Sequence, residues 1–184
     1  SFANYPNMYG ITISAWVNPA TTGERYQRIV DKGYTTNYQL AIDTTDAISF
    51  AVVTDLGSIN DASCGTVTPD IWSHVVATWN GTHYECYINS VPSGLGGTLA
   101  GNYIPSHSLP LTIGDRTLGD ASFNGQIDAL QIWDRALTTN EISNLYNGTT
   151  NNSNYIGKYA SDGDFKSLVF YNETSTYWNT TMSV

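Results

Sequence analysis

The stretch 123–146, FNGQIDALQIWDRALTTNEISNLY, constrains the fold of this chain more than any other. It opens with an Asn-Gly pair, which readily takes positive φ in a tight turn. A strand with period-2 alternation follows, and the alternation predicts Asp128 on the same face as Leu130 and Ile132. We therefore expect a half-buried strand that carries a carboxylate toward an apolar layer.

A short helix is predicted directly after this strand. Thr138 begins Thr-Thr-Asn-Glu, the capping-box pattern of a helix N-terminus. In this pattern the threonine and the glutamate each accept, through the side chain, a hydrogen bond from the backbone N–H of the other. The helix should cover residues 139–146, with Ile142, Leu145 and Tyr146 on one apolar stripe.

The rest of the chain is organised as short strands between polar turns. Alternating or apolar runs predict strands at 11–17, 26–32, 37–42, 48–53, 72–79, 84–89 and 109–113. Asn80-Gly81 predicts a hairpin turn, whereas Asp55, Asn60 and Asp61 are assigned to a polar loop. Many strands and one helix predict an all-β, two-sheet antiparallel β-sandwich.

Three segments resemble a laminin-G-like, concanavalin A-like jelly-roll domain, and they occur in the family's order. They are ITISAWVNP (11–19), WSHVVATWNGTHYECYINS (72–90) and the stretch 123–146 with its Phe-x-Gly-x-Ile-Asp run. The resemblance implies a jelly-roll sandwich with a short helix toward its C-terminal side. It does not imply one activity, because this architecture hosts lectins, adhesion modules and hydrolases.

The two ends of the chain depart from that family. Its domains usually open with a strand about twenty residues before the tryptophan strand, and residues 1–10 are too short to supply one. We expect a jelly-roll domain at 1–148, a polar linker at 149–164 and a C-terminal strand segment at 165–184. The last segment is predicted to complete the sandwich, either in its own domain or in a neighbouring subunit; a solvated stalk is the alternative.

Charge and hydropathy exclude some partners. The net charge is −9 with seven Lys and Arg, so binding to a nucleic-acid backbone, which needs clustered cations, is not expected. No run approaches 18 apolar residues, so no membrane span is predicted.

Sequons and cysteines favour an extracellular protein or one on a cell or virion surface. Five glycosylation sequons occur, at Asn80, Asn147, Asn151, Asn172 and Asn179. Cys86 shares strand parity with inward-facing neighbours, and oxidation is favoured in an exported chain, so we predict a disulfide between Cys64 and Cys86. Two buried free thiols are the alternative.

Catalysis of the glucanase kind is not expected. A retaining glycosidase needs paired carboxylates about 5 to 5.5 Å apart, which neighbouring same-face positions of one strand provide. Four glutamates are present, and none lies two or four residues from another: Glu24, Glu85, Glu141 and Glu173. The chain is predicted to be non-enzymatic, with a glycoside hydrolase kept as a remote alternative.

Asp128 is the main candidate metal ligand. A carboxylate on an apolar face needs a partner, which backbone N–H groups, a tyrosine hydroxyl or a calcium ion can supply. Related jelly-roll domains hold calcium with this aspartate and with carbonyl oxygens near the domain start, which implies residues 3–7 or the tail here. Asp115, Asp120 and Asn124 are weaker candidates for a second calcium or ligand site.

Exposed aromatic side chains are the candidates for stacking on sugars, namely Tyr34, Tyr38, Trp16 and Tyr103, with ordinary strand packing as the alternative. We therefore predict a binding or adhesion module for a glycan or surface glycoprotein. The alternative is a structural subunit of a surface layer, filament or virion that assembles with copies of itself by strand donation. An aromatic strip on a concave sheet would favour the first, and a detachable edge strand the second.

Overall fold

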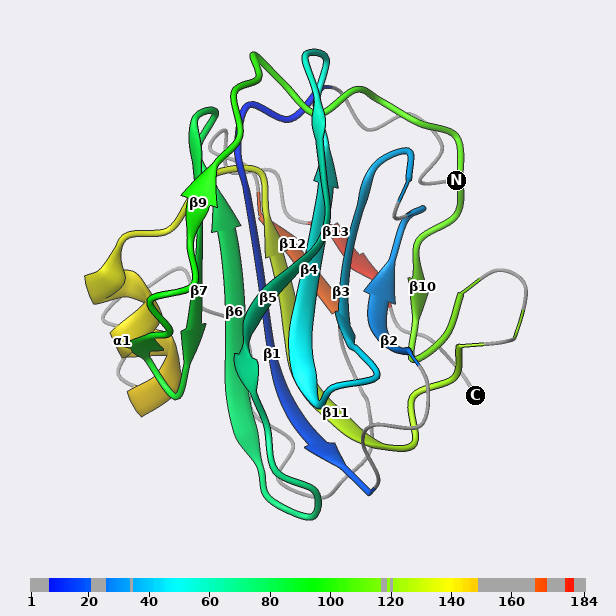
Figure 1. Cartoon of the computed structure of the whole chain (residues 1–184), viewed down its shortest axis with the longest axis vertical. Helices are drawn as coiled ribbons and strands as arrows, with labels where there is room; N and C mark the ends of the chain where they lie inside the picture. The colour runs from blue at the N-terminus through cyan, green and yellow to red at the C-terminus, as the bar shows by residue number, and fades with distance from the viewer. Residues whose placement is uncertain are drawn as a thin grey trace.

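The computed structural model describes residues 7–20, 26–33, 35–116, 119, 121–148, 168–171 and 178–180, and these form two packed β-sheets (Figure 1). One sheet has the order β13-β12-β11-β1-β6-β7-β8, with β9 also paired to β7. The other has the order β10-β2-β3-β4-β5. The predicted all-β, two-sheet sandwich is confirmed.

The strands of the eight-stranded sheet are β1 (Ile11–Pro19), β6 (Ser73–Trp79), β7 (His83–Ile88), β8 (Val91–Pro92), β9 (Gly97–Thr98), β11 (Gly125–Trp133), β12 (Leu168–Tyr171) and β13 (Trp178–Thr180). The five-stranded sheet contains β2 (Gln27–Asp31), β3 (Tyr38–Ile42), β4 (Ala47–Val53), β5 (Ser58–Thr66) and β10 (Thr112–Ile113). β5 corrects the sequence prediction of a polar loop there. Its backbone pairs with β4, and that tertiary pairing overrides the weak strand propensity of Asn60 and Asp61.

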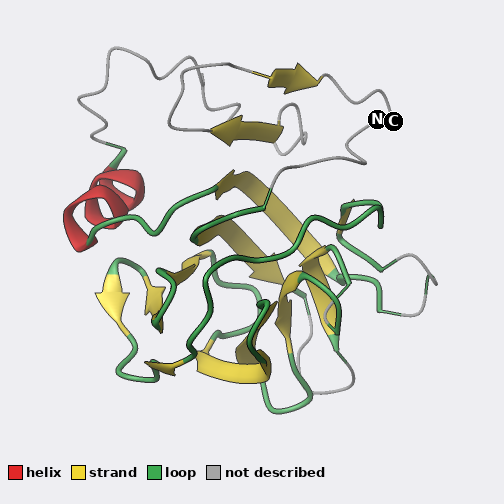
Figure 2. Cartoon of the chain, turned by 90° about the horizontal axis from the view of Figure 1, so that it is seen from above, coloured by secondary structure: helices red, strands yellow, loops and turns green. Residues whose placement is uncertain are grey.

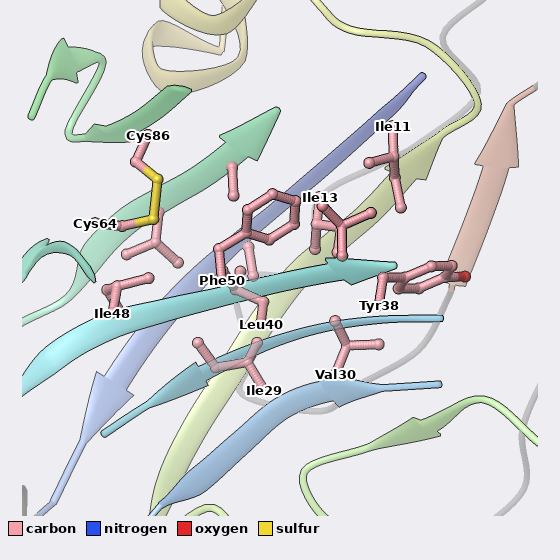
Figure 3. Packing of buried hydrophobic residues seen from close by; sticks show 14 of the residues in the cluster. Ile11, Ile13, Ile29, Val30, Tyr38, Leu40, Ile48, Phe50, Cys64 and Cys86 are labelled. Carbon is pink, nitrogen blue, oxygen red and sulfur yellow. A yellow bond between two sulfur atoms is a disulfide. The ribbon is translucent and has the colours of Figure 1, made fainter. Parts of the chain in front are cut away.

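Aliphatic and aromatic side chains from both sheets fill the space between them. Figure 3 shows Phe50, Leu40 and Ile29 of one sheet packed toward Ile11 and Ile13 of the other. These side chains are fully buried. Burying one such side chain contributes about 1.5–3 kcal/mol, so this layer supplies the main stabilisation of the sandwich.

A disulfide joins the two sheets. Cys64 of β5 is bonded to Cys86 of β7, and both side chains are buried in the core (Figure 3). The predicted pairing is confirmed. Because the two strands belong to different sheets, the bond holds the sheets together at one side of the core.

The outward face of the five-stranded sheet is polar and yet buried. Cross-strand partners share a face, and the register places Arg28 opposite Ala41, and Ala41 opposite Ser49. Asp31 and Gln39 form another pair on this face. Each of these residues is at most 6% exposed, so the face is no open platform for a ligand.

The helix α1 (Thr139–Asn147) is capped as the sequence predicts and ends one residue later than expected. The Thr138 side chain accepts from the Glu141 backbone N–H, and the Glu141 carboxylate accepts from the Thr138 backbone N–H. Ile142 and Leu145 pack against Val76 on the outer face of the eight-stranded sheet. Figure 2 shows the helix outside the strands.

The C-terminal strands extend the eight-stranded sheet beside β11. β12 pairs with β11 in parallel, with Val169 opposite Gln131, and β13 pairs with β12 antiparallel. In this structure both strands lie against their own chain. The proposed linker 149–164 lies outside the described residues.

Replacing both cysteines with alanine should lower the free energy of unfolding by roughly 3 kcal/mol, because the unfolded chain loses a cross-link between residues 22 apart. Urea unfolding of the wild type, with and without reductant, measures the effect. Reduced wild type should match the variant, and the variant should not respond to reductant. Two alkylatable thiols in the native wild type would contradict the disulfide.

Deleting residues 165–184 should destabilise or aggregate the domain, because β11 then loses the strand that covers its edge. Thermal melting and light scattering of the truncated chain test this. Deleting only 181–184, beyond β13, is the matched control and should leave the melting temperature unchanged. A chain lacking 165–184 that melts like the parent would show that the segment is a stalk.

Candidate functional site

Three loop segments meet at one end of the sandwich, at the top of Figure 1. They are residues 7–10, 54–57 and 99–106, and we call them the loop rim. Met8 and Ile104 exchange two backbone hydrogen bonds, of 3.1 and 2.7 Å. The Asp55 N–H donates to the Tyr103 carbonyl at 3.1 Å. The segment 99–106 is therefore bonded to both of the others.

Asp55 organises the centre of the loop rim. Its carboxylate accepts hydrogen bonds from the Asn102 backbone N–H at 2.8 Å and from the Asn102 side-chain amide at 2.9 Å. The Tyr103 backbone N–H adds a third, at 3.3 Å. The Asn102 side chain, followed by these backbone groups, lowers the pKa of Asp55, so this exposed acid is ionised at neutral pH.

The loop rim is held to the core by further hydrogen bonds. The Thr54 hydroxyl bonds to the Ala100 carbonyl at 3.2 Å and accepts from the Gly57 N–H at 3.1 Å. The buried Trp79 indole N–H donates to the Leu99 carbonyl at 2.9 Å. A Cβ at Gly101 would lie 2.5 Å from Thr54, so this position requires glycine. The rim is thus a braced structure in which side chains have defined positions.

Two tyrosines pack together at the loop rim, and the backbone of one of them, Tyr103, bonds to Asp55. Tyr9 and Tyr103 pack edge to face, with ring centroids 6.3 Å apart and an interplanar angle of 70°. Tyr9 is 71% exposed and Tyr103 is half-buried. Aromatic faces, hydroxyl groups, a carboxylate and an amide here occupy one braced rim. These groups can stack on an apolar ring face and hydrogen-bond to hydroxyl groups.

The structure separates the four aromatic candidates predicted from the sequence. Tyr103 lies at the loop rim. Tyr38 is only 4% exposed in the core, so its prediction as a sugar-stacking residue is wrong. Trp16 stacks on Tyr146 at 5.6 Å, so helix α1 covers one face of its ring. Tyr34 lies outside the described residues.

His74 is packed and hydrogen-bonded in the outer layer of the eight-stranded sheet. Its Nε2 lies 2.8 Å from the Ser14 hydroxyl, and its ring lies against Trp16 and Tyr146. Burial lowers the pKa of His74 to about 4, because the imidazolium would lose its hydration. Ser14 and His74 are each 2% exposed, so this Ser–His pair is closed to substrate.

Asp128 is not on the face predicted for it. β1 and β11 shift register between Ser14 and Trp16, and Ala129 has φ of +47°, which marks a β-bulge. The extra residue reverses the alternation. Asp128 therefore lies opposite Trp16 on the outer side, while Leu130 keeps its place in the core.

The described residues around Asp128 do not test the predicted calcium site. Asp128 accepts from the Ala129 N–H at 2.7 Å, and no group of three acidic, His or Cys side chains that could hold a metal occurs in the described part of the chain. Of the expected companions, 3–6 are not described, and Asn7 precedes the opposite end of β1. Calcium at Asp128 stays a prediction from the resemblance.

Asp115 closes a loop. Its carboxylate accepts from the Arg116 N–H at 2.7 Å, the Ala121 N–H at 3.2 Å and the Ser122 hydroxyl at 2.7 Å. The Asn124 backbone N–H donates to the Gln27 side chain. Asp120 is outside the described residues. The described contacts show a turn-forming role for Asp115, and a second calcium site stays a prediction.

Two of the five sequons have described side chains. Asn80 is exposed at the β6–β7 turn, where its side-chain oxygen accepts from the Thr82 and His83 N–H groups. Asn147 ends helix α1, and its amide donates to the Ser143 carbonyl. Asn151 and Asn172 lie outside the described residues. Asn179 lies in β13, and its side chain is not described. Glycosylation stays a prediction at all five.

Sequence reasoning missed Tyr9, Asp55 and Asn102. Asp55 was assigned to a polar loop without a role, and nothing in the local pattern indicates that loops about fifty residues apart converge. The available signal was composition alone, since these turns carry aromatic and amide side chains that a bare turn does not need.

The chain belongs to the concanavalin A-like lectin/glucanases superfamily, because its Laminin_G_3 family model matches residues 3–143. The chain is also 25% identical over 147 residues to adhesion G-protein coupled receptor V1 of Danio rerio. That match covers 74% of this chain and 2% of the receptor, so the chain corresponds to a very small part of that relative.

Solved structures share the fold. A native heptameric SAP-like pentraxin from Limulus polyphemus has a TM-score of 0.56 at 20% identity, covering 77% of this chain and 71% of the other. A putative carbohydrate binding protein from Bacteroides ovatus has a TM-score of 0.63 at 16% identity, covering 78% and 42%. Domain 4 of AbnA, an extracellular arabinanase from Geobacillus stearothermophilus solved with arabinotriose, has a TM-score of 0.60 at 18% identity, covering 77% and 70%. At these identities the likeness establishes the jelly-roll fold alone.

The buried imidazole should make stability pH-dependent. In the unfolded chain His74 titrates near 6.5, and in the native protein near 4, so the unfolded state binds more protons between these values. Above about pH 6.5 His74 is neutral in both states, so the native state keeps its full stability there. As the pH drops toward 4, the free energy of unfolding should fall by about 3 kcal/mol because His74 is protonated more readily in the unfolded chain.

Urea unfolding at intervals from pH 7 to 4.5 measures this slope. His74→Gln should flatten it, and His83→Gln, on the exposed hairpin, should not. The window avoids Glu141, whose pKa is held at about 2, mainly by Arg135, and whose contribution is lost only below about pH 4.5. An unchanged slope in His74→Gln would contradict the assignment.

Proposed function

We propose that this chain is a non-enzymatic, extracellular glycan-binding module that binds through the loop rim. The observation that carries the proposal is the Tyr9–Tyr103 ring pair, in which Tyr9 is exposed and Tyr103 is bonded through its backbone to the carboxylate of Asp55. Sugar rings have an apolar C–H face and a rim of hydroxyl groups, so a site for them combines aromatic faces with fixed polar groups.

The braced geometry supports this role. Asp55 and Asn102 are held in place by bonds to each other, and Tyr103 is tied to Asp55 through both its N–H and its carbonyl. Preorganised groups lose little conformational freedom when a ligand binds, which favours affinity for a small, well-hydrated ligand. The Tyr9 side chain is the most exposed of the large apolar side chains described.

The loop rim is favoured over the sheet faces. The outward face of the five-stranded sheet is buried, and helix α1 packs on the other sheet. An aromatic strip on a concave sheet would have favoured a binding module, but the face described above is buried, and the Tyr9–Tyr103 pair lies on loops.

The non-enzymatic part of the proposal rests on the described acids. The Glu85 carboxylate accepts from the Tyr87 hydroxyl, while Glu141 is bound to Arg135 and the helix cap, so these two acids serve separate structural contacts. The extracellular part is supported by the disulfide and by the similarity to an adhesion receptor. No helix in the described ranges is long and apolar enough to cross a membrane.

A second candidate function is a subunit that assembles by strand exchange. The observation that favours it is the pairing of β11 with a segment from the far end of the chain, through three residue pairs. The same edge of another copy offers identical backbone groups. A concentration-dependent dimer or polymer that the 165–184 deletion abolishes would support this function.

Tyr9→Ala and Tyr103→Ala should each weaken the binding of neutral oligosaccharides roughly fivefold, because an aromatic contact contributes about 1 kcal/mol. A glycan array identifies the ligand, and calorimetry then gives Kd. Trp72→Ala is the matched control, since Trp72 is 40% exposed and lies before β6, away from the three loop segments. Equal Kd values for wild type and both tyrosine variants would contradict the proposed site.

A further inference from the structure

We infer that the loop rim selects uncharged glycans and discriminates against acidic ones such as uronate or sialylated sugars. This inference rests on the proposed function and adds the chemical class of ligand. The inference depends on the charge of the loop rim, which is the sum of the charged side chains in the segments 7–10, 54–57 and 99–106.

Asp55 is the one charged residue in these three segments, which contain no lysine or arginine. Its carboxylate accepts three N–H groups from Asn102 and Tyr103 and stays exposed to solvent. None of those donors carries a charge. The rim therefore presents a fixed negative charge with no cation to bind a sugar carboxylate.

The four lysine and arginine side chains described elsewhere all have partners within the chain, and the half-buried Arg116 is one of them. Arg28 is 4% exposed and lies 3.6 Å from Asp31. The Lys32 ammonium is buried and donates to the Leu109 carbonyl at 2.8 Å. Arg135 is paired with Glu141 at 2.6 Å. Arg28, Lys32 and Arg135 are therefore held in contacts with groups that lie outside the three rim segments.

The net charge of the chain also disfavours acidic ligands. With −9 over the whole chain, an anionic ligand approaches against a negative field, whereas a neutral ligand does not. Two unit charges about 6 Å apart in water repel by an amount equal to roughly a threefold loss of affinity. Because the rim is exposed, salt should reduce this discrimination.

Leu56 offers a sharp test that leaves the binding groups intact. It is next to Asp55 and 67% exposed, so its side chain can be replaced with little effect on packing. Leu56→Lys adds a cation at the rim, and Leu56→Gln is a neutral control of similar size. Only the lysine variant changes the local charge.

The experiment measures Kd for matched ligand pairs: trimers of glucose, galactose and mannose beside trimers of the corresponding uronic acids, and lactose beside 3′-sialyllactose. For the pair whose neutral member binds, wild type should prefer that member by about threefold or more at low salt. Leu56→Lys should reduce the ratio toward one, Leu56→Gln should keep it, and added salt should lower it in wild type.

Equal or tighter binding of the acidic member by wild type, or an unchanged ratio in Leu56→Lys, would overturn the inference. These outcomes leave the proposed function standing if Tyr9→Ala still weakens binding. If Tyr9→Ala and Tyr103→Ala leave Kd unchanged, or if no pair binds, the proposed site fails and the inference fails with it.

Discussion

Burial of apolar side chains between the two sheets is the interaction on which the rest of this structure depends. The core excludes water from Phe50, Leu40, Ile13 and their neighbours, and the disulfide joins the sheets at its side. Trp79 connects this layer with the surface, because its ring is fully buried and its indole N–H donates to Leu99 in the loop rim. The position of the rim is therefore coupled to the packing of the core.

The rim shows how loops far apart in the sequence form one surface on a jelly-roll frame. Strands supply a rigid frame, and the loops between them carry side chains that the frame does not need for stability. Here one segment precedes β1, another connects β4 and β5, and the third follows β9. Thr54, Asp55 and the backbone of 99–106 cross-link them, so residues distant in sequence act as one surface.

The outer layers of the molecule also shape where a ligand can bind. Helix α1 covers part of the eight-stranded sheet with Ile142 and Leu145 and stacks Tyr146 on Trp16. The buried polar face of the other sheet includes Arg28 and Asp31, which lie within ion-pair distance. The proposed loop rim lies outside these covered regions and carries Tyr9, which is 71% exposed.

Local patterns in the sequence determined much of this fold. The capping box at Thr138, the Asn80-Gly81 turn and the alternation of β1 were predictable because each depends on residues close in sequence. The Cys64–Cys86 pairing followed from the inward parity of Cys86, a short-range feature, and from the expectation that the chain is exported. The family was identifiable from three such motifs in order.

Tertiary structure decided the rest. The bulge at Ala129 reversed the alternation of side chains at Asp128. The local sequence did not predict the bulge, because a bulge is a property of the pairing between two strands. β5 formed on a segment of weak strand propensity because β4 offered it a partner. Tyr38 proved to be core and Tyr103 a rim residue, although both are tyrosines beside turns. Burial depends on which strands pack together, and loop convergence depends on the path of the whole chain.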